Sequence, residues 1–484
     1  MISFLAGAAT VLAFAPVGVF PLALATFAFL IHLWMHASPR QCFWRGFWFG
    51  LGLYGAGVSW VYVSLHTFGG MPAPLAGFFT VGYCAFLALF PAAAGWLQAR
   101  IPAPDPVRAC LLIPSAWVLF EWTLEWLFTG FPWLAIGYAA VGWPLQGYAP
   151  LAGVYGLTLA TLALAGMLWV LIQRPRKPAF AVGIAVLIAV GQALQAVQWT
   201  RPSGEPVAAA LLQGNIEQEM KFSPQRYPAI FDTYARLAEG TSAKLIVLPE
   251  TALPKFYHRV DPAELARLDA AARNNAGDLL LGVPYLDGEN YYNSVVTLGV
   301  SPRQRYDKVH LVPFGEFIPP GFGWVLEILR IPLSDFSRGS PAQPALAVAG
   351  QRVAVNVCYE DVFGDEMAAR AAAATLLVNV SNVAWFGDSL APAQHLQIGR
   401  LRAIETGRMH LTATNTGITA AIDRDGRVLG RLPQFTEARL EVAAQGYEGV
   451  TPYVRWRDWP IVLLSLALLG FFIIRARLSP QSTG

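Results

Sequence analysis

Long apolar segments occupy the first 200 residues of the chain and return once near its C-terminus. Most of them approach the ~20 residues that an α-helix needs to cross a bilayer. They lie at residues 1–14, 20–34, 43–65, 74–97, 107–128, 151–172, 179–197 and 459–474. The pattern therefore predicts an α-helical transmembrane bundle of about eight spans, with a large polar region before the last one.

That polar region, residues 201–456, alternates between two kinds of segment. Short apolar runs typical of buried strands lie at 208–213, 245–248, 279–283, 293–298, 353–357, 375–380 and 411–422. Helical periodicity appears between them at 224–238, 262–274, 365–374 and 392–407. Such alternation predicts a layered α/β domain. We expect three parts: helices over 1–200, the α/β domain over 201–456, and a final helix with a short tail over 457–484.

The composition strengthens the membrane assignment. Hydrophobic residues make up 55% of the chain and charged residues only 13%, about half the share in a soluble protein. The net charge of +3 is small and dispersed, so nothing favours a nucleic-acid partner. A cleaved signal peptide is not expected, because the first 25 residues lack a basic start and a clear cleavage site.

The basic residues of the loops predict the orientation. They fall in alternate loops, at Arg40, Arg45, Arg100, Arg108, Arg174, Arg176 and Lys177. The intervening loops contain no lysine or arginine, so the positive-inside bias places the basic loops in the cytoplasm. The polar domain is then exoplasmic, and Arg475 and Arg477 place the C-terminus in the cytoplasm.

Cys358 stands apart from the other three cysteines. Cys42, Cys84 and Cys110 fall in predicted cytoplasmic or membrane positions, whereas Cys358 ends the β-branched run 352–357 of the exoplasmic domain. An unpaired thiol in an oxidising compartment suggests reactivity. A small buried core residue is the alternative, and at this point neither interpretation prevails.

Two further strand ends carry ionisable residues. Glu250 ends the run that starts at Lys244, and Lys308 stands in the largely apolar stretch 306–316. Ligand-binding and catalytic groups of α/β folds gather at such ends. Glu250 could accept the thiol proton of Cys358, and Lys308 could stabilise a thiolate and an oxyanion. Taken singly, a turn carboxylate and a surface lysine are the commoner roles.

The segments Leu248–Thr251, Tyr306–Glu316 and Asn356–Glu360 resemble the Glu–Lys–Cys motifs of the nitrilase superfamily. Set between seven leading spans and one closing span, they resemble the apolipoprotein N-acyltransferase family over essentially the whole chain. Further segments that look like this family are 131–134, 380–388 and 394–397. The resemblance implies a nitrilase-like αββα fold for the exoplasmic domain.

The resemblance also implies roles for individual residues. Glu250 would be the general base, Lys308 the cation that stabilises the oxyanion, and Cys358 the nucleophile. Supporting residues would be Glu316, which assists the lysine, and Tyr359 and Glu360, which adjoin the cysteine. Two positions depart from the family pattern: Phe222 stands where some members have tryptophan, and Val383 where aspartate is expected.

The implied reaction is a two-step acyl transfer at the bacterial inner membrane, with the catalytic domain on the periplasmic side. An acyl chain would pass from a phospholipid to Cys358, and then to the α-amino group of an S-diacylglyceryl cysteine in a lipoprotein. A monomer would suffice, and no metal or organic cofactor is implied. The chain contains neither an HExxH motif, a CxxC pair nor a glycine-rich phosphate loop.

Several aromatic residues are expected to face lipid. The stretch 313–336, with Phe314 and Phe317, is apolar enough for a lid that contacts the bilayer. Packing as a core helix is the alternative. Trp385, Phe386 and Gly387 would form a second arm with a glycine hinge. Loop residues lining the lipid entrance would include Trp133, unless they form an ordinary interfacial belt.

Three other functions remain open. A membrane-anchored nitrilase-type amidase would use the same three residues with water as acceptor, but the apolar lid argues against it. A transporter would need polar or broken segments within the membrane, and the spans show few apart from Glu121 and Glu125. A catalytically inactive domain would be excluded by a reactive Cys358.

Overall fold

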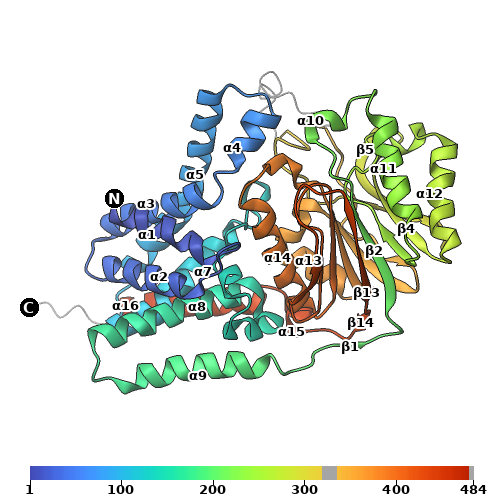
Figure 1. The fold of residues 1–484 in the computed structure, drawn as a ribbon. Helices are drawn as coiled ribbons and strands as arrows, with labels where there is room; N and C mark the ends of the chain where they lie inside the picture. The colour runs from blue at the N-terminus through green and yellow to red at the C-terminus, as the bar shows by residue number, and fades with distance from the viewer. Residues whose placement is uncertain (319–334, 479–484) are drawn as a thin grey trace, which may run out of the picture. The chain divides into compact units, whose positions relative to one another are not determined.

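The computed structural model describes residues 1–318 and 335–478 of the chain. The chain divides into two compact units (Figure 1). The helical unit contains Met1–Ser59, Gly77–Gln198 and the residues from Arg455 onward. The α/β unit contains Trp199–Val454 together with Trp60–Ala76, a segment that interrupts the helical unit.

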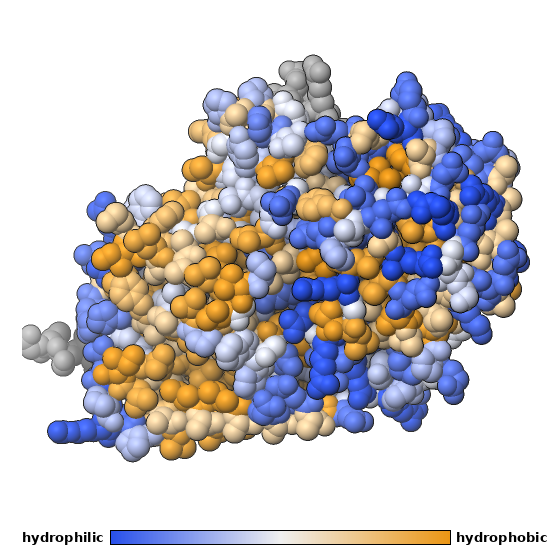
Figure 2. Space-filling view, in the orientation of Figure 1, coloured by the Kyte–Doolittle hydropathy of each residue, from blue (hydrophilic) through white to orange (hydrophobic). Residues whose placement is uncertain are grey.

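The helical unit is built from apolar helices. Its principal helices are α1 (Ile2–Thr10), α2 (Phe20–Met35), α3 (Pro39–Gly57), α5 (Ala73–Ala99), α7 (Ile113–Thr123), α8 (Ala149–Gln173), α9 (Pro178–Leu194) and α16 (Trp459–Leu478). Three helical stretches of the described chain are long and apolar enough to cross a membrane: Ala73–Ala99, Pro144–Gln173 and Trp459–Leu478. Figure 2 shows hydrophobic side chains over much of the visible face of this unit. A count of eight spans stays a prediction.

Glycines allow α1 and α3 to approach closely. A Cβ atom on Gly7 would lie 1.9 Å from the carbonyl oxygen of Phe49, and one on Gly52 would lie 2.0 Å from that of Phe4. Small residues at helix crossings bring backbones into direct contact, the usual way in which membrane helices associate.

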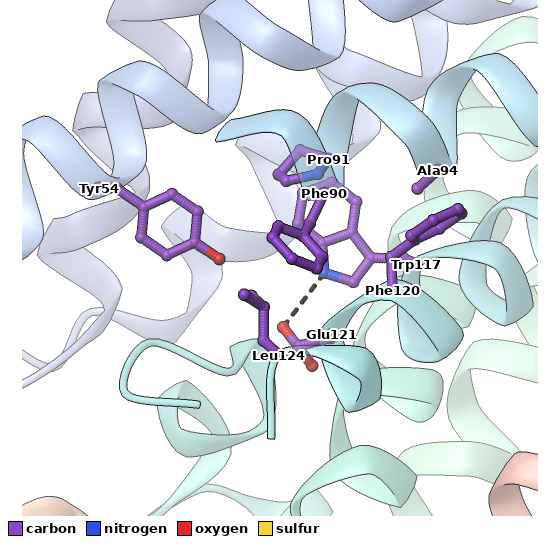
Figure 3. Close-up of a pocket in the computed structure, with 8 residues that line it drawn as sticks. All are labelled: Tyr54, Phe90, Pro91, Ala94, Trp117, Phe120, Glu121 and Leu124. Atoms are coloured by element: carbon purple, nitrogen blue, oxygen red, sulfur yellow. Dashed lines mark hydrogen bonds between the residues drawn. The ribbon is translucent and has the colours of Figure 1, made fainter. Parts of the chain in front are cut away.

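Glu121 of α7 is a buried carboxylate inside the helical unit. It accepts hydrogen bonds from Trp117 Nε1 at 3.2 Å, the backbone N–H of Ile136 at 2.9 Å and Thr158 Oγ1 at 2.6 Å. Figure 3 shows its side chain at a cavity of about 10 Å³, which is close to the limit for a single water molecule. The residues that line this cavity are Tyr54, Phe90, Pro91, Ala94, Trp117, Phe120, Glu121 and Leu124. Because its donors come from three segments, Glu121 ties the packing of this unit together.

The α/β unit contains two six-stranded sheets. The first has the order β13 (Ala438–Ala444), β2 (Val207–Gln213), β3 (Leu245–Val247), β4 (Asp278–Asp287), β5 (Asn290–Gly299) and β6 (Arg305–Asp307). The second has the order β12 (Val428–Arg431), β11 (Ala420–Ile422), β10 (His410–Thr414), β9 (Leu376–Ser381), β8 (Gln351–Val357) and β7 (Leu346–Val348). In both sheets three central strands are parallel and the outer strands are antiparallel. A short ribbon pairs β1 (Arg201–Pro202) with β14 (Tyr447–Glu448).

The two sheets face each other and helices cover their outer faces (Figure 1). One apolar core lies between the sheets, with Val247 from the first and Val355 from the second. The first sheet packs outward against α11 (Tyr227–Glu239) and α12 (Pro262–Asn274), and the second against α13 (Gly364–Ala371) and α14 (Ala391–Thr406). Because both faces of each sheet are covered, the central strands are continuously apolar rather than alternating. The layers are αββα.

Two sequence expectations need correction. The run 411–422 is not one strand, because β10 and β11 form an antiparallel pair separated by residues 415–419, which include Asn415 and Gly417. The apolar segment 43–65 is not one helix, because α3 ends at Gly57 and residues 60–76 belong to the α/β unit. Hydrophobicity alone reveals neither break.

Candidate active site

Cys358 lies directly after β8, where the backbone turns sharply. Its φ is +53°, a left-handed conformation that costs a non-glycine residue about 1 kcal/mol or more. Asn379 Nδ2, from the neighbouring strand β9, donates to the carbonyl oxygen of Cys358 at 3.1 Å. The side chain remains partly exposed. The turn therefore presents the thiol at the edge of the sheet.

Glu250 follows β3 and is oriented by two donors. Its Oε1 accepts from Asn293 Nδ2 at 2.7 Å, and its Oε2 accepts from the backbone N–H of Asn382 at 2.8 Å. Asn293 belongs to β5, whereas Asn382 directly follows β9 of the other sheet. Residues from both sheets therefore hold this carboxylate in one orientation.

Lys308 directly follows β6 and is almost completely buried. Its Nζ lies 2.8 Å from Glu316 Oε2 and 3.6 Å from Glu250 Oε1. Asn293 Nδ2 bridges the two carboxylates, since it also donates to Glu316 Oε1 at 2.7 Å. Burial alone would lower the pKa of Lys308, but Glu316 and Glu250 hold it above its usual value. Lys308 is therefore a fixed positive charge.

The electrostatic environment keeps the Cys358 thiol protonated in the resting state. Burial and, after it, the Glu250 carboxylate raise its pKa to about 12. Lys308 and a hydrogen bond with Ser381 oppose this rise. These interactions place Cys358, Glu250 and Lys308 in one electrostatic cluster. A reaction at the sulfur therefore requires a proton acceptor, and Glu250 is the carboxylate that acts on it most strongly.

Glu360 ties the end of β8 to the segment that follows β6. It is fully buried and accepts from the backbone N–H groups of Val357 at 2.7 Å and Val309 at 2.8 Å. Tyr306 OH donates to it at 2.8 Å and Arg370 Nη2 at 3.1 Å. Burial would raise the pKa of Glu360, but Arg370 and the Val357 amide outweigh burial and lower it. This carboxylate fixes the strand end that carries the cysteine relative to the segment that carries the lysine.

The neighbours of Glu360 are also buried. Tyr359 packs edge-on against Phe363, with ring centroids 5.2 Å apart. Asp361 Oδ1 lies 3.3 Å from His410 Nε2, and its Oδ2 lies 3.5 Å from His395 Nε2. Within residues 1–318 and 335–478, no group of three or more histidine, cysteine or acidic side chains is arranged to hold a metal ion.

Comparisons with known proteins agree with this architecture. A family model described as the apolipoprotein N-acyltransferase N-terminal domain matches residues 6–167, and one described as carbon-nitrogen hydrolase matches residues 188–448. An apolipoprotein N-acyltransferase of Nitrosomonas europaea is 47% identical over 99% of this chain and 97% of its own length. The chain belongs to the apolipoprotein N-acyltransferase family. A relative of the same name from Methylococcus capsulatus is 44% identical over 97% of this chain and 95% of its own length.

Solved structures show a likeness to this family member over part of its length. A CN-hydrolase superfamily protein from Xanthomonas campestris is 19% identical, covers 54% of this chain and 97% of its own, and has a TM-score of 0.39. A nitrilase superfamily member from Saccharomyces cerevisiae is 17% identical, covers 59% of this chain and 100% of its own, and has a TM-score of 0.37.

The expected second arm of this family member is docked within the α/β unit. Ser64 Oγ donates to the carbonyl oxygen of Trp385 at 2.8 Å, and the rings of Trp60 and Phe386 lie 4.4 Å apart. Gly387 follows with φ +57°. The segment 60–76 therefore holds the loop that continues from Asn382, one of the donors to Glu250.

The other residues that we expect to face lipid, with Phe222 among them, lie in varied surroundings. Most of the expected lid, residues 313–336, lies outside the described residues; Phe314 and Phe317 are described and partly exposed. Phe222, partly exposed, follows helix α10 (Gln218–Lys221). Trp133 is only 2% exposed within the helical unit, where it stacks on Phe131 with centroids 6.2 Å apart. Their contact with lipid stays a prediction.

Sequence reasoning missed several residues of the site. Asn293 gave no signal, because asparagine in a strand is common, and Asn382 lay in the family-like segment 380–388 without being assigned a role. Arg370, which pairs with Glu360, looked like an ordinary surface residue of a helix. Lys221 carried one usable signal, a lysine between the apolar residues Met220 and Phe222. It is 1% exposed.

Proposed function

We propose that this chain transfers an acyl chain from a phospholipid to the α-amino group of an S-diacylglyceryl cysteine at the N-terminus of a lipoprotein. Cys358 carries the acyl chain between the two substrates as a thioester. The observation that supports this most directly is the geometry at the strand ends: a partly exposed thiol beside a carboxylate and a buried ammonium. The family membership identifies the kind of substrate.

In the first step Glu250 accepts the proton of the Cys358 thiol, and the sulfur attacks the carbonyl carbon of a phospholipid ester. Lys308 stabilises the oxyanion of the resulting tetrahedral intermediate. The carbon–oxygen bond to the glycerol then breaks. Glu250 returns its proton to the leaving oxygen, which releases a lysophospholipid and leaves a thioester.

In the second step the α-amino group of the lipoprotein attacks the thioester carbonyl. Glu250 accepts a proton from the attacking amine, a carbon–nitrogen bond forms, and the carbon–sulfur bond breaks. The proton passes to the sulfur and regenerates the thiol. Separating one ester-to-amide transfer into two easier steps is the general advantage of covalent catalysis, and it predicts ping-pong kinetics.

Glu316, Tyr359 and Glu360 support these steps by holding the reacting groups. Glu316 keeps Lys308 beside Glu250, since it binds the lysine Nζ at 2.8 Å and the Val312 N–H at 2.8 Å. The other carboxylate oxygen of Glu316 also accepts from Lys308 Nζ, so two oxygens orient the ammonium. This arrangement avoids a reorganisation of the charges during the reaction.

Both substrates carry lipid chains, so we place the enzyme in the bacterial inner membrane as a multi-pass protein with the α/β domain on the periplasmic side. The loop charges support this orientation. We retain boundaries near residues 200 and 457, about eight spans and a cytoplasmic C-terminus as parts of the proposal. Trp385, Phe386, Phe314 and Phe317 would contact the acyl chains, and a monomer suffices for the reaction.

The direct test is an acyl adduct on Cys358. Purified protein incubated with a defined phospholipid should gain the mass of one acyl chain, located to Cys358 by peptide mass spectrometry. Cys358→Ala should gain none, whereas Cys84→Ala, which changes a buried cysteine of the helical unit, should behave as wild type. Folded wild-type protein that never acquires an adduct would overturn the proposal.

The acceptor distinguishes acyl transfer from hydrolysis. A diacylated lipopeptide with a free α-amino group should discharge the thioester far faster than water does, by about a hundredfold or more if the site orients the amine. Equal rates of thioester discharge with and without this amine would favour the membrane-anchored amidase.

A further inference from the structure

Lys221 is a second buried lysine at the strand ends that carry Glu250 and Cys358. It is the last residue of the short helix α10 and only 1% of its side chain is exposed. Its Nζ donates to the carbonyl oxygen of Glu250 at 3.1 Å. Its charge interacts with the Glu250 carboxylate and with Cys358. Nothing in the reaction described above uses this ammonium.

The charges of the cluster show what Lys221 contributes. Glu250 and Glu316 are two buried carboxylates that share the single ammonium of Lys308. One positive charge against two negative charges would leave an uncompensated charge in a poorly solvated place, which is costly. Lys221 supplies the second positive charge. A negative charge near Lys221 also persists during the reaction. The proton moves between Glu250 and Cys358, and the charges of both groups interact with Lys221.

Helix α10 is held in place by the same loop that orients Glu250. Asn382 Nδ2 donates to Gln218 Oε1 at 2.8 Å, while the Asn382 N–H donates to the Glu250 carboxylate at 2.8 Å. Lys221 binds the backbone of the turn itself, next to Thr251, whose φ is +48°. A strained turn persists only where its surroundings hold it, and Lys221 is one of the groups that do so.

We propose that Lys221 is a positioning residue of this active site, whose buried ammonium balances the second carboxylate and holds the turn that carries Glu250. Through Glu250 and the local field it makes ionisation of Cys358 easier. The inference rests on the thioester chemistry proposed above.

The proposal predicts a particular dependence on pH. Burial lowers the pKa of Lys221 to about 8, while Glu250 and Cys358 oppose this effect. Lys221 is therefore charged below pH 8 and loses its charge as the pH rises through that value. The charged and titratable groups that face it are Glu250 and Cys358, with Lys308 and Glu316 beyond them; Glu217 and Glu219 of its own segment are exposed. Its help to the thiol should fade above pH 8.

The test measures the reactivity of Cys358 in the full-length protein with methyl methanethiosulfonate, located by peptide mass spectrometry, from pH 6.5 to 9.5. At pH 6.5, Lys221→Met should react about tenfold more slowly than wild type, which corresponds to one unit in the pKa of the thiol. The two rates should converge above pH 8. Lys221→Arg should match wild type at pH 6.5 and exceed it at pH 9, because arginine keeps its charge. Lys244→Met, at an exposed position, is the matched control.

The alternatives give distinct results. Equal rates for wild type and Lys221→Met at every pH, or a ratio that stays constant across the pH range, would overturn the proposal and leave Lys221 a packing residue. Where Lys221→Met does not fold, the comparison of Lys221→Arg with wild type decides alone. Acylation of the wild type by phospholipid is measured in parallel. If phospholipid does not acylate the wild type, the proposed function is rejected. The pH dependence of Cys358 reactivity tests the role of Lys221 independently of that result.

Discussion

At the scale of single residues, two glutamates at the site do different work although both are buried. Glu250 is held by two neutral donors, Asn293 and the Asn382 N–H, and faces the thiol. Glu360 accepts from an arginine, a tyrosine and backbone N–H groups, and none of its bonds leads to the sulfur. The first carboxylate is the proton acceptor that we propose. The second has its pKa lowered by Arg370 and backbone N–H groups, and it anchors the end of β8.

We therefore expect Glu250→Gln and Glu360→Gln to fail in different ways. Glu250→Gln should slow thioester formation by about 10²–10⁴-fold, the range of a lost general base. Its melting temperature should fall less than that of Glu360→Gln, because Lys308 keeps Glu316 at 2.8 Å. Glu360→Gln removes the fully buried partner of Arg370, which keeps only the more exposed Glu366 at 3.4 Å, and breaking a buried pair costs about 3–5 kcal/mol. At about 2–4 °C per kcal/mol its melting temperature should fall by about 10 °C or more.

Thermal unfolding and single-turnover acylation measured on both variants would check this division. Glu205→Gln, which changes an exposed carboxylate just before β2, serves as the control for charge removal. A stable Glu360→Gln protein, or full acylation by Glu250→Gln, would contradict the assignment.

At the scale of elements, short turns after the strands carry the proposed catalytic residues, and unusual backbone angles shape two of these turns. Cys358 and Thr251 have positive φ values without being glycine, and Gly387 ends the turn that follows Asn382. Gly387 has φ +57° and ψ −156°, a region open essentially to glycine alone. A Cβ atom there would lie 3.1 Å from Val63. The loop that orients Glu250 thus depends on a glycine and on the segment 60–76 packed against it.

Gly387→Ala should therefore slow thioester formation, by about tenfold for a loss near 1.4 kcal/mol in transition-state stabilisation. Gly288→Ala is the matched control. Gly288 also has a positive φ, +60°, but lies at the β4–β5 hairpin with nothing within 4 Å of its added Cβ. Both variants bear backbone strain, so comparable melting temperatures with a rate loss confined to Gly387→Ala would be the expected result. Equal rates of thioester formation in the two variants would show that this loop does not affect the reaction.

At the scale of the whole molecule, one chain combines apolar helices with an αββα domain of ordinary polarity. The family membership covers both parts, since the two matching family models lie one after the other along the chain. A catalytic domain that lies between apolar helices in the chain, α9 before it and α16 after it, would meet lipid substrates without having to extract them into water. That arrangement agrees with the proposed acyl transfer and would serve little purpose in an amidase with a soluble substrate.

The proposed orientation predicts which positions an impermeant maleimide reaches. Gly288→Cys, at the tip of an exposed hairpin of the α/β unit, should be labelled in intact spheroplasts. Arg176→Cys, in the basic loop before α9, should be labelled only after the membrane is opened. The parent protein supplies the background from its own cysteines. The reverse pattern would place the α/β unit in the cytoplasm and overturn the proposed location.

Local sequence patterns were enough to predict most of the secondary-structure elements. The apolar runs and the alternation over 201–456 predicted the helices and most strands, including 262–274 as observed in α12. They failed at 411–422, where a turn interrupts an apolar run, and at β13, whose half-exposed side chains give no clear signal. Both failures arise because pairing with distant strands decides where such segments bend or extend.

The sequence by itself determined that this is a membrane protein with an α/β domain, that Glu250 and Cys358 end apolar runs and that Lys308 stands in a largely apolar stretch, because these are properties of neighbouring residues. Only the tertiary structure brought the three together, since they are 50 or more residues apart and meet through strand order in two facing sheets. It alone also showed that Asn293, Asn382 and Lys221 bind Glu250. Burial and hydrogen bonding give these residues their importance, and both depend on the completed fold.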